Sequence, residues 1–268
     1  MKPLKVAIAG LGTIGRTVAR SLNRGMQGLE LAAAAVGDRE KARAWLEKEG
    51  LSTPLVGLEE LPERADIIIE AAPAAVFEQV VRPALDAGKT AIVLSSGALL
   101  RKPELVELAT AKGARLVVPS GGLLGLDAVL AAAEGTIQSV RMTTRKPPGG
   151  LVGAPHLEKN GISLEGLKQP LRVFSGTARE AVAGFPANVN VVATVSLAGI
   201  GPERTTIEIW ADPTVTRNCH KIEVESDSAR FTVETEVLPS ENPKTGRIVA
   251  LSVVAALRKL TSSLRIGT

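Results

Sequence analysis

Short apolar runs alternate with longer amphipathic stretches over the first 120 residues of the chain. The apolar runs contain almost no polar positions, which is typical of strands buried on both faces of a sheet. The stretches between them repeat apolar residues at helical spacing, and several end at a glycine. This alternation predicts a parallel, doubly wound sheet. The predicted strands are 6–9, 29–36, 67–69, 91–94 and 116–118, and the predicted helices are 14–23, 74–87 and 103–112.

The pattern changes after Pro119, where apolar and polar residues begin to alternate one by one. Such alternation is typical of a mainly antiparallel sheet with one face in water. The spacing of Thr177 and Glu180 is that of a capping box, which starts a helix. We expect strands at 137–145, 204–211, 221–225 and 231–237, and helices from Pro186 to about Ala198 and over 245–260.

Three glycines, Gly10, Gly12 and Gly15, follow the first predicted strand and open the first predicted helix. In that context the spacing G-x-G-x-x-G predicts a dinucleotide-binding turn. The first glycine permits the tight turn, the second lets a pyrophosphate approach the backbone, and the third lets the helix pack near the strand. Thr13 and Ile14 complete the turn, where the amides of the helix N-terminus face the phosphates.

Asp38 follows the second predicted strand, near the distance from the glycine turn at which a carboxylate binds the ribose hydroxyls. The alternative role is to cap the helix that begins near Arg39. A ribose-binding carboxylate favours NAD, because it repels the 2′-phosphate of NADP. Arg39 would instead stack on the adenine and tolerate that phosphate, so NADP remains the alternative cofactor.

These features predict an α/β protein with three segments. Residues 1–120 form a dinucleotide-binding Rossmann domain, and residues 121–244 form an α+β domain with a mainly antiparallel sheet. Residues 245–268 contain a C-terminal helix that packs back on the first domain. We expect the second domain to bind the substrate and carry the catalytic residues.

Charge and composition narrow the class of protein further. The 32 basic and 28 acidic residues are spread without a long basic run, and only 2% of residues are aromatic, which argues against a nucleic-acid partner. Apolar stretches are too short for a membrane span, and the N-terminal sequence does not have the pattern of a signal peptide. The single cysteine, Cys219, excludes an intrachain disulfide and fits a reducing compartment. We therefore expect a cytoplasmic protein with neither a membrane nor a nucleic-acid partner.

The chain has two histidines, His156 and His220. His156 stands in a loop rich in glycine and proline, where we expect a surface role. His220 precedes the alternating segment 221–225, and its parity matches the apolar face of that strand. It is either a buried core histidine or a base that accepts a proton as hydride leaves the substrate. Neither His220 nor Cys219 has a partner at zinc-site spacing, so we expect no metal.

Two small-residue segments, 95–98 and 120–122, follow predicted strands of the first sheet. Ligands bind beyond the carboxyl ends of the strands in open parallel sheets. We interpret both segments as loops near the site, with Ser96 as a substrate-binding candidate.

Several segments, taken in order along nearly the whole chain, resemble the L-aspartate dehydrogenase family. The glycine turn is shared by many dehydrogenases, whereas the segment Asn188-Val189-Asn190 and the placement of His220 are more specific. The matching segments are 10–15, 70–73, 95–99, 119–122, 125–127, 185–191, His220 and 242–245.

The resemblance implies that L-aspartate is oxidised to iminoaspartate, with hydride passing to the nicotinamide of NAD or NADP. Iminoaspartate would then enter NAD biosynthesis or hydrolyse to oxaloacetate and ammonia. His220 would be the catalytic histidine. Asn190, Gly121 and Gly122 would contact the nicotinamide end of the cofactor, with Gly122 standing where the family usually has alanine.

The resemblance also suggests a homodimer, whose interface the exposed alternating sheet of the second domain, residues 121–244, would supply. For the two substrate carboxylates the sequence offers Asn188, Asn242 and Lys244 as further binding candidates beside Ser96. The alternative for Lys244 is a purely structural place in the loop before the last helix.

Two other interpretations share the same glycine turn. A related two-domain reductase would act on another amino acid, a semialdehyde or a cyclic imine. A non-catalytic NAD-binding redox sensor would bind the cofactor without turnover. Measuring NAD(P)H production over a panel of amino acids separates these interpretations.

Overall fold

The computed structural model describes residues 2–186, 189–241 and 246–267. The chain divides into two compact units. Unit 1 comprises Met1–Pro119 and Val249–Arg265, and unit 2 comprises Ser120–Ile248 and Ile266–Thr268. Among the described residues, no helix is both long enough and apolar enough to cross a membrane.

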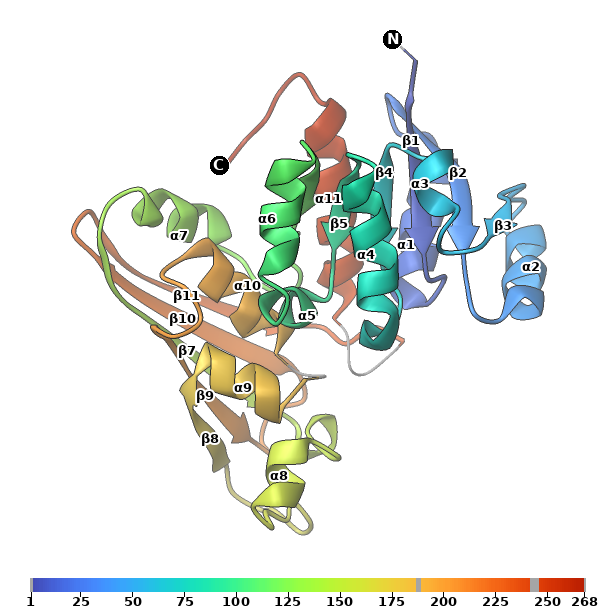
Figure 1. Cartoon of the computed structure of the whole chain (residues 1–268). Helices are drawn as coiled ribbons and strands as arrows, with labels where there is room; N and C mark the ends of the chain where they lie inside the picture. The colour runs from blue at the N-terminus through green and yellow to red at the C-terminus, as the bar shows by residue number, and fades with distance from the viewer. Residues whose placement is uncertain (1, 187–188, 242–245, 268) are drawn as a thin grey trace. The chain divides into compact units, whose positions relative to one another are not determined.

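A parallel six-stranded sheet forms the centre of unit 1 (Figure 1). The strands lie in the order β3-β2-β1-β4-β5-β6. β2 and β3 are therefore added on one side of β1 and the next three strands on the other, and the strand order switches between β1 and β4. That switch is the point at which doubly wound sheets bind dinucleotides. The predicted parallel sheet is thus confirmed. Its strands are β1 (Leu4–Ala9), β2 (Leu29–Ala35), β3 (Leu55–Val56), β4 (Ile67–Glu70), β5 (Thr90–Val93) and β6 (Arg115–Val117).

Helices cover both faces of this sheet, which explains why its strands are apolar throughout. Val6 and Ile8 of β1 pack against one layer of helices, while Ala7 and Ala9 pack against the other. The first layer holds α1 (Thr13–Asn23), α2 (Arg39–Lys48) and α11 (Arg247–Thr261). The second holds α3 (Leu61–Arg64), α4 (Phe77–Asp86), which follows the short turn η1 (Ala74–Val76), α5 (Ser96–Leu100) and α6 (Glu104–Ala111).

A mixed five-stranded sheet forms unit 2, in the order β11-β10-β7-β9-β8. Of the described strand pairs within this sheet, β7 with β9 is parallel and the other three are antiparallel, so the sheet is mostly antiparallel, as predicted. The strands are β7 (Ile137–Lys146), β8 (Leu171–Thr177), β9 (Thr205–Ala211), β10 (Asn218–Ser226) and β11 (Arg230–Val237).

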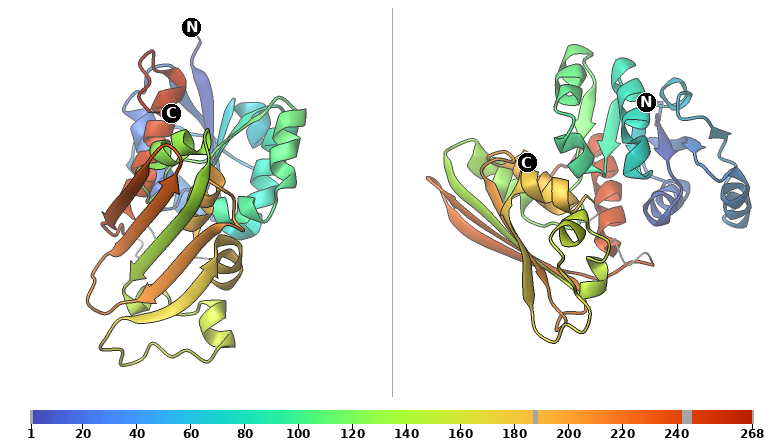
Figure 2. Two further views of the ribbon diagram at one scale, coloured as in Figure 1. Left: turned by 90° about the vertical axis from the view of Figure 1, so that its left-hand side faces the viewer. Right: turned by 60° about the horizontal axis from the view of Figure 1, so that its bottom comes forward.

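Helices of unit 2 lie on one face of its sheet (Figures 1 and 2). They are α7 (Leu126–Ala133), α9 (Ala178–Gly184) and α10 (Asn190–Ala198), while η2 (Pro148–Gly150) and α8 (Pro155–Lys159) follow β7. The predicted capping box is confirmed, because the Thr177 side chain accepts from the Glu180 backbone and the Glu180 side chain accepts from the Thr177 backbone.

Three local predictions were wrong. Residues 96–100 form the helix α5 rather than a loop, because consecutive buried apolar residues after Ser96 pack into the second helix layer. Pro186 is a turn residue, and α10 begins at Asn190. The strand β10 begins at Asn218, so His220 lies inside the strand rather than before it. In addition, β3, β8, α3, α7 and α8 carried too short or too weak a pattern to be predicted.

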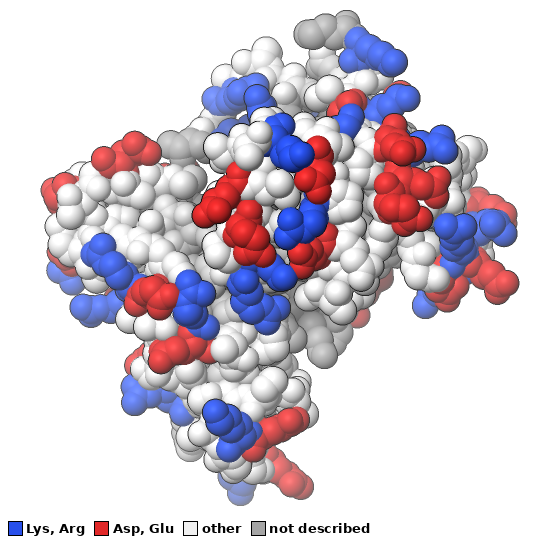
Figure 3. Space-filling view, viewed as in Figure 1, with Lys and Arg blue, Asp and Glu red and all other residues white. Residues whose placement is uncertain are grey.

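Acidic and basic side chains are interspersed over the face of the molecule drawn in Figure 3. Many of them pair locally, as Glu78 does with both Arg82 and Lys102. Such a mixed surface is typical of charges that solvate a protein rather than of a field that attracts a polyanion.

Candidate functional site

The glycine turn of unit 1 is shaped for a dinucleotide pyrophosphate. Gly10 has a φ of 97°, and a Cβ there would overlap the carbonyl oxygen of Ala71. A Cβ on Gly15 would overlap the carbonyl oxygen of Gly10, so the close packing of α1 on β1 requires glycine. Gly12 differs, because a Cβ at this exposed position would meet no described atom within 4 Å. Open space in front of Gly12 leaves room for a phosphate to approach the backbone.

The N-terminus of α1 provides the matching donors. Gly12 is its N-cap, and Thr13 and Ile14 stand in its first turn. Among the described residues, no side chain caps these amides and the first turn contains no acidic residue. Free amides and the helix dipole favour an anion at this position. The residues of the turn therefore fit the pyrophosphate of a dinucleotide.

Asp38 caps the N-terminus of α2, which is the alternative role that the sequence offered for this residue. Its Oδ1 accepts a hydrogen bond of 3.0 Å from the backbone nitrogen of Lys41. Both Asp38 and its neighbour Arg39 are exposed just beyond β2. A carboxylate that caps with one oxygen keeps the other for further hydrogen bonds. The ribose-binding role thus remains a prediction.

Glu70 is a buried carboxyl that sequence reasoning did not assign a role. It stands at the end of β4 and accepts hydrogen bonds from the backbone nitrogens of Leu94 and Ser95, at 3.1 and 2.9 Å. The hydroxyl of Ser95 donates a third, of 2.9 Å. Burial raises the pKa of Glu70 to about 7, although these bonds oppose the shift. Glu70 therefore ties the ends of β4 and β5 together, next to the fully buried Ser96 that begins α5.

Replacing Glu70 with glutamine is expected to change how stability depends on pH. The unfolded chain releases this proton near the ordinary pKa of 4.5, but the folded chain holds it up to about 7. The contribution of Glu70 to the free energy of unfolding therefore falls as pH rises through this window, by at most about 3 kcal/mol. We expect Glu70→Gln to gain stability relative to the wild type from pH 4.5 to about 7 in urea unfolding. Parallel profiles of the two proteins would show that Glu70 titrates normally.

Unit 2 brings His220 together with two polar residues on one buried face of its sheet. His220 is 5% exposed and pairs across the sheet with Thr144 of β7, whose Oγ1 lies 3.1 Å from its Nδ1. Lys146, two residues further along β7 and therefore on the same face, is 6% exposed. Burial, followed by the charge of Lys146, lowers the pKa of His220 to about 3. The imidazole is therefore neutral throughout the physiological range.

The opposite neighbour of His220 is Thr235 on β11. Its Oγ1 is buried and has no hydrogen-bond partner within the part of the chain that the structure describes. Buried hydroxyls are normally satisfied by a hydrogen bond, so one without a described partner beside His220 makes this a candidate position for a polar ligand group.

The predicted nicotinamide-contacting residues lie near His220 within unit 2. A Cβ on Gly122 would be 3.7 Å from Val191 and 3.8 Å from Val237. Val191 follows Asn190, the exposed first residue of α10, and Val237 pairs with Asn218, two residues before His220. The turn at Gly121 and Gly122, the start of α10 and the His220 end of β10 therefore meet at one end of the sheet.

Replacing Gly122 with alanine is expected to be tolerated. The added methyl would make ordinary van der Waals contacts, and this glycine has no positive φ. We expect stability to rise by about 0.4–1 kcal/mol, because alanine restricts the unfolded chain. Gly121→Ala is the matched control, since its φ of 63° strains any other residue. Thermal unfolding that ranked the two variants the other way would contradict this geometry.

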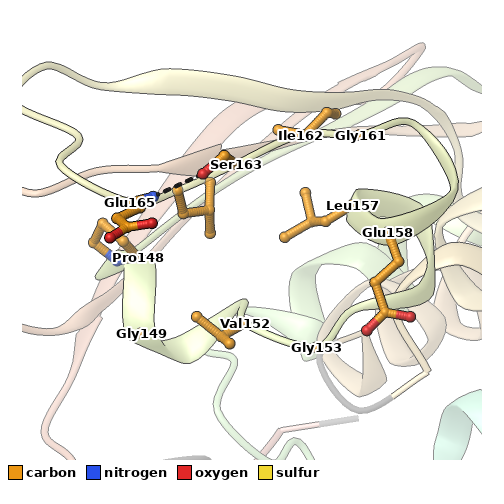
Figure 4. A pocket seen from close by; sticks show the side chains of 11 residues that line it. Pro148, Gly149, Val152, Gly153, Leu157, Glu158, Gly161, Ile162, Ser163 and Glu165 are labelled. Atoms are coloured by element: carbon orange, nitrogen blue, oxygen red, sulfur yellow. Dashed lines mark hydrogen bonds between the residues drawn. The ribbon is translucent and has the colours of Figure 1, made fainter.

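Some predicted site residues cannot be placed beside this face. Asn188, Asn242 and Lys244 lie outside the described residues. His156 is half-buried, with its ring centroid 5.2 Å from those of both Phe174 and Phe185, so it is a packing residue rather than a surface one. Figure 4 shows a hollow with Val152, Leu157 and Ile162 in its lining; it contains none of the predicted site residues.

Thr144, Thr235 and Lys146 were not identified from the sequence as candidate site residues. The alternation along β7 contained a signal for one of them, Lys146. In β7 the buried positions alternate, and Lys146 continues the parity of Val140 and Met142. A lysine at an inward position is unusual enough to predict a special role. Among the described residues, no group of three or more His, Cys, Asp or Glu side chains is arranged to hold a metal ion.

Two family models match the chain. The model described as "Aspartate dehydrogenase, C-terminal" matches residues 127–260, and "Homoserine dehydrogenase, NAD binding domain" matches residues 10–119. The L-aspartate dehydrogenase of Bradyrhizobium diazoefficiens is 55% identical over 99% of this chain and 94% of its own length. L-aspartate dehydrogenase 3 of Bordetella bronchiseptica is 52% identical over 99% of this chain and 98% of its own length.

The fold is also similar to that of a solved structure. The crystal structure of aspartate dehydrogenase from Thermotoga maritima superposes with a TM-score of 0.74 and covers 98% of this chain and 99% of its own. At 22% identity, this likeness supports the fold alone.

Proposed function

Because this chain belongs to the L-aspartate dehydrogenase family, we propose that it oxidises L-aspartate to iminoaspartate with a nicotinamide dinucleotide. It is an oxidoreductase acting on a CH–NH2 group, and unit 1 contains an NAD-binding domain. The observation that carries the proposal for the site is the buried, neutral His220, next to Thr144 and near the Gly122 turn.

We propose NAD as the preferred cofactor and NADP as the alternative. Gly12 leaves the backbone open to the pyrophosphate, Gly10 and Gly15 allow the close packing that forms the turn, and the first turn of α1 supplies amide donors. The exposed carboxylate of Asp38 beyond β2 supports binding of the ribose hydroxyls and disfavours a 2′-phosphate. Asn190 and the Gly121–Gly122 turn would contact the nicotinamide end.

When bound, the nicotinamide supplies the hydride acceptor. The chain must hold Cα of aspartate in line with it and remove a proton from the substrate ammonium, because a protonated amine cannot stabilise the developing iminium. His220 either takes that proton or orients the group that does.

A panel of amino acids tests this function directly. Purified protein with NAD or NADP is expected to reduce the cofactor with L-aspartate and not with D-aspartate, L-glutamate or L-alanine. Oxaloacetate plus ammonia with NADH measures the reverse direction at the same site. Turnover with a different amino acid would indicate a related reductase, and cofactor binding without any turnover would indicate a sensor.

We also propose that the protein is a homodimer and that the polar face of the unit 2 sheet supplies the interface. On this face Arg145 and Arg172 flank Trp210, with their guanidinium carbons 4.7 and 6.0 Å from the ring centroid. Arg and Trp are enriched in protein interfaces. Light scattering of the purified protein is expected to give twice the chain mass, and Trp210→Glu to give the single chain mass.

A further inference from the structure

Lys146 is the one buried lysine among the described residues, and the proposed function so far gives it no role. It ends β7 two residues after Thr144, the residue that contacts the His220 ring. Its opposite neighbour on β9 is Ala211, so a small side chain flanks it on that strand. Because His220 pairs with Thr144, Lys146 is its diagonal neighbour on the same face of β7, and the charge of Lys146 contributes to the lowered pKa of His220.

Other charged groups of these strands alternate to the opposite face. Arg145 on β7 pairs with Asp212 there, at 3.1 Å, and Glu208 on β9 binds Trp210 and Arg172. Glu236 of β11 opposes Cys219 and so shares that face as well. On the buried face the titratable side chains of the described strands are therefore His220 and Lys146.

The reaction needs a base matched to an alkylammonium. An imidazole whose pKa is about 3 is too weak, because proton transfer from the substrate ammonium to it would be strongly uphill. Burial lowers the pKa of Lys146 to about 8, so roughly a tenth of its amine is neutral at pH 7 and about half at pH 8. An amine is also close in basicity to the group that it must deprotonate.

Resting on the proposed function, we propose that Lys146 is the proton acceptor for the substrate ammonium, and that His220 and Thr144 hold the amine in place beside it. The lone pair of Nζ takes one proton from the ammonium, which leaves a neutral substrate amine and a lysine ammonium. The nitrogen lone pair then forms the C=N bond as the Cα–H bond breaks, and its two electrons leave with the hydride. Lys146 returns its proton to water before the next turnover.

The test compares Lys146→Met with Lys112→Met. Lys112 is an exposed lysine of unit 1, 3.7 Å from Asp86 and outside both the proposed site and the proposed dimer interface, so its loss is expected to leave turnover unchanged. Lys146→Met is expected to lower kcat with L-aspartate by about 10²–10⁴-fold, the usual contribution of a general base. Lys146→Arg is expected to lose as much, because a guanidinium keeps the charge but does not release its proton at working pH.

Two further measurements separate a base from a carboxylate-binding or structural lysine. Succinate has both carboxylates but no amine, and its dissociation constant on the NADH-bound protein is expected to stay within about threefold in Lys146→Met. In Lys146→Ala, added ethylamine is expected to restore part of the turnover, which a structural role would not allow. Succinate binding that is retained in a variant also reports that unit 2, which carries residue 146, is folded.

Wild-type kcat retained in both Lys146→Met and Lys146→Arg would overturn the proposal. The proposal would also be overturned if Lys146→Arg kept its turnover while Lys146→Met bound succinate more weakly. Together these two results would identify Lys146 as a cation that binds a substrate carboxylate. A wild-type protein without activity on L-aspartate would instead contradict the proposed function.

Discussion

Replacing His220 with alanine is expected to lower turnover of L-aspartate by about 10²–10⁴-fold. The side chain is buried and bonded to Thr144, and it lies near the turn that we propose to contact the nicotinamide. Its removal deletes the group that positions the substrate amine. NAD affinity is expected to remain nearly intact, because the pyrophosphate is assigned to the glycine turn of unit 1.

The control for this variant is the second histidine of the chain. His156 packs against Phe174 and Phe185, so His156→Ala is expected to lower stability while leaving turnover per folded molecule close to that of the wild type. Circular dichroism and NAD titration would confirm that both variants are folded. Unchanged turnover in His220→Ala would remove this residue from the site.

Replacing Gly12 with alanine is expected to weaken NAD binding by at least about tenfold, or 1.4 kcal/mol, without destabilising the fold. Its φ of −77° suits any residue, and the added methyl would meet no described atom of the protein. The methyl would instead occupy the space in which the pyrophosphate approaches the backbone. NAD titration and thermal unfolding measure the two effects separately.

Gly15→Ala is the matched variant with the opposite expectation. Its methyl would overlap the carbonyl oxygen of Gly10, so we expect a loss of about 1–3 kcal/mol in the free energy of unfolding as α1 moves away from β1. Equal NAD affinity in Gly12→Ala and the wild type would contradict the proposed position of the pyrophosphate.

The first sheet was predictable because its residues carry two independent signals. The apolar run 67–69 has no polar position to break it, and the helices between the strands end at glycines such as Gly88 and Gly113, both with positive φ. The helix α5 was missed, because five residues are too few to show a helical period.

The chemistry of the site was only partly predictable. The parity of His220 indicated the buried face, but its partners come from residues 144 and 235, far away in the sequence. Pairing of β10 with β7 brings Thr144 and Lys146 beside it, and no local pattern specifies which strands become neighbours. Lys146 is a charged residue at a position where the alternation along β7 predicts a buried side chain. That mismatch was the signal available in the sequence.

The central claim is that this chain transfers hydride from Cα of L-aspartate to its cofactor at the face that carries His220. The most direct measurement incubates the protein with NAD and L-aspartate deuterated at Cα and determines the mass of the reduced cofactor. The account predicts that the reduced nicotinamide carries the deuterium and that His220→Ala forms almost none of it. Reduced cofactor without deuterium, or none at all from the wild-type protein, would contradict the account.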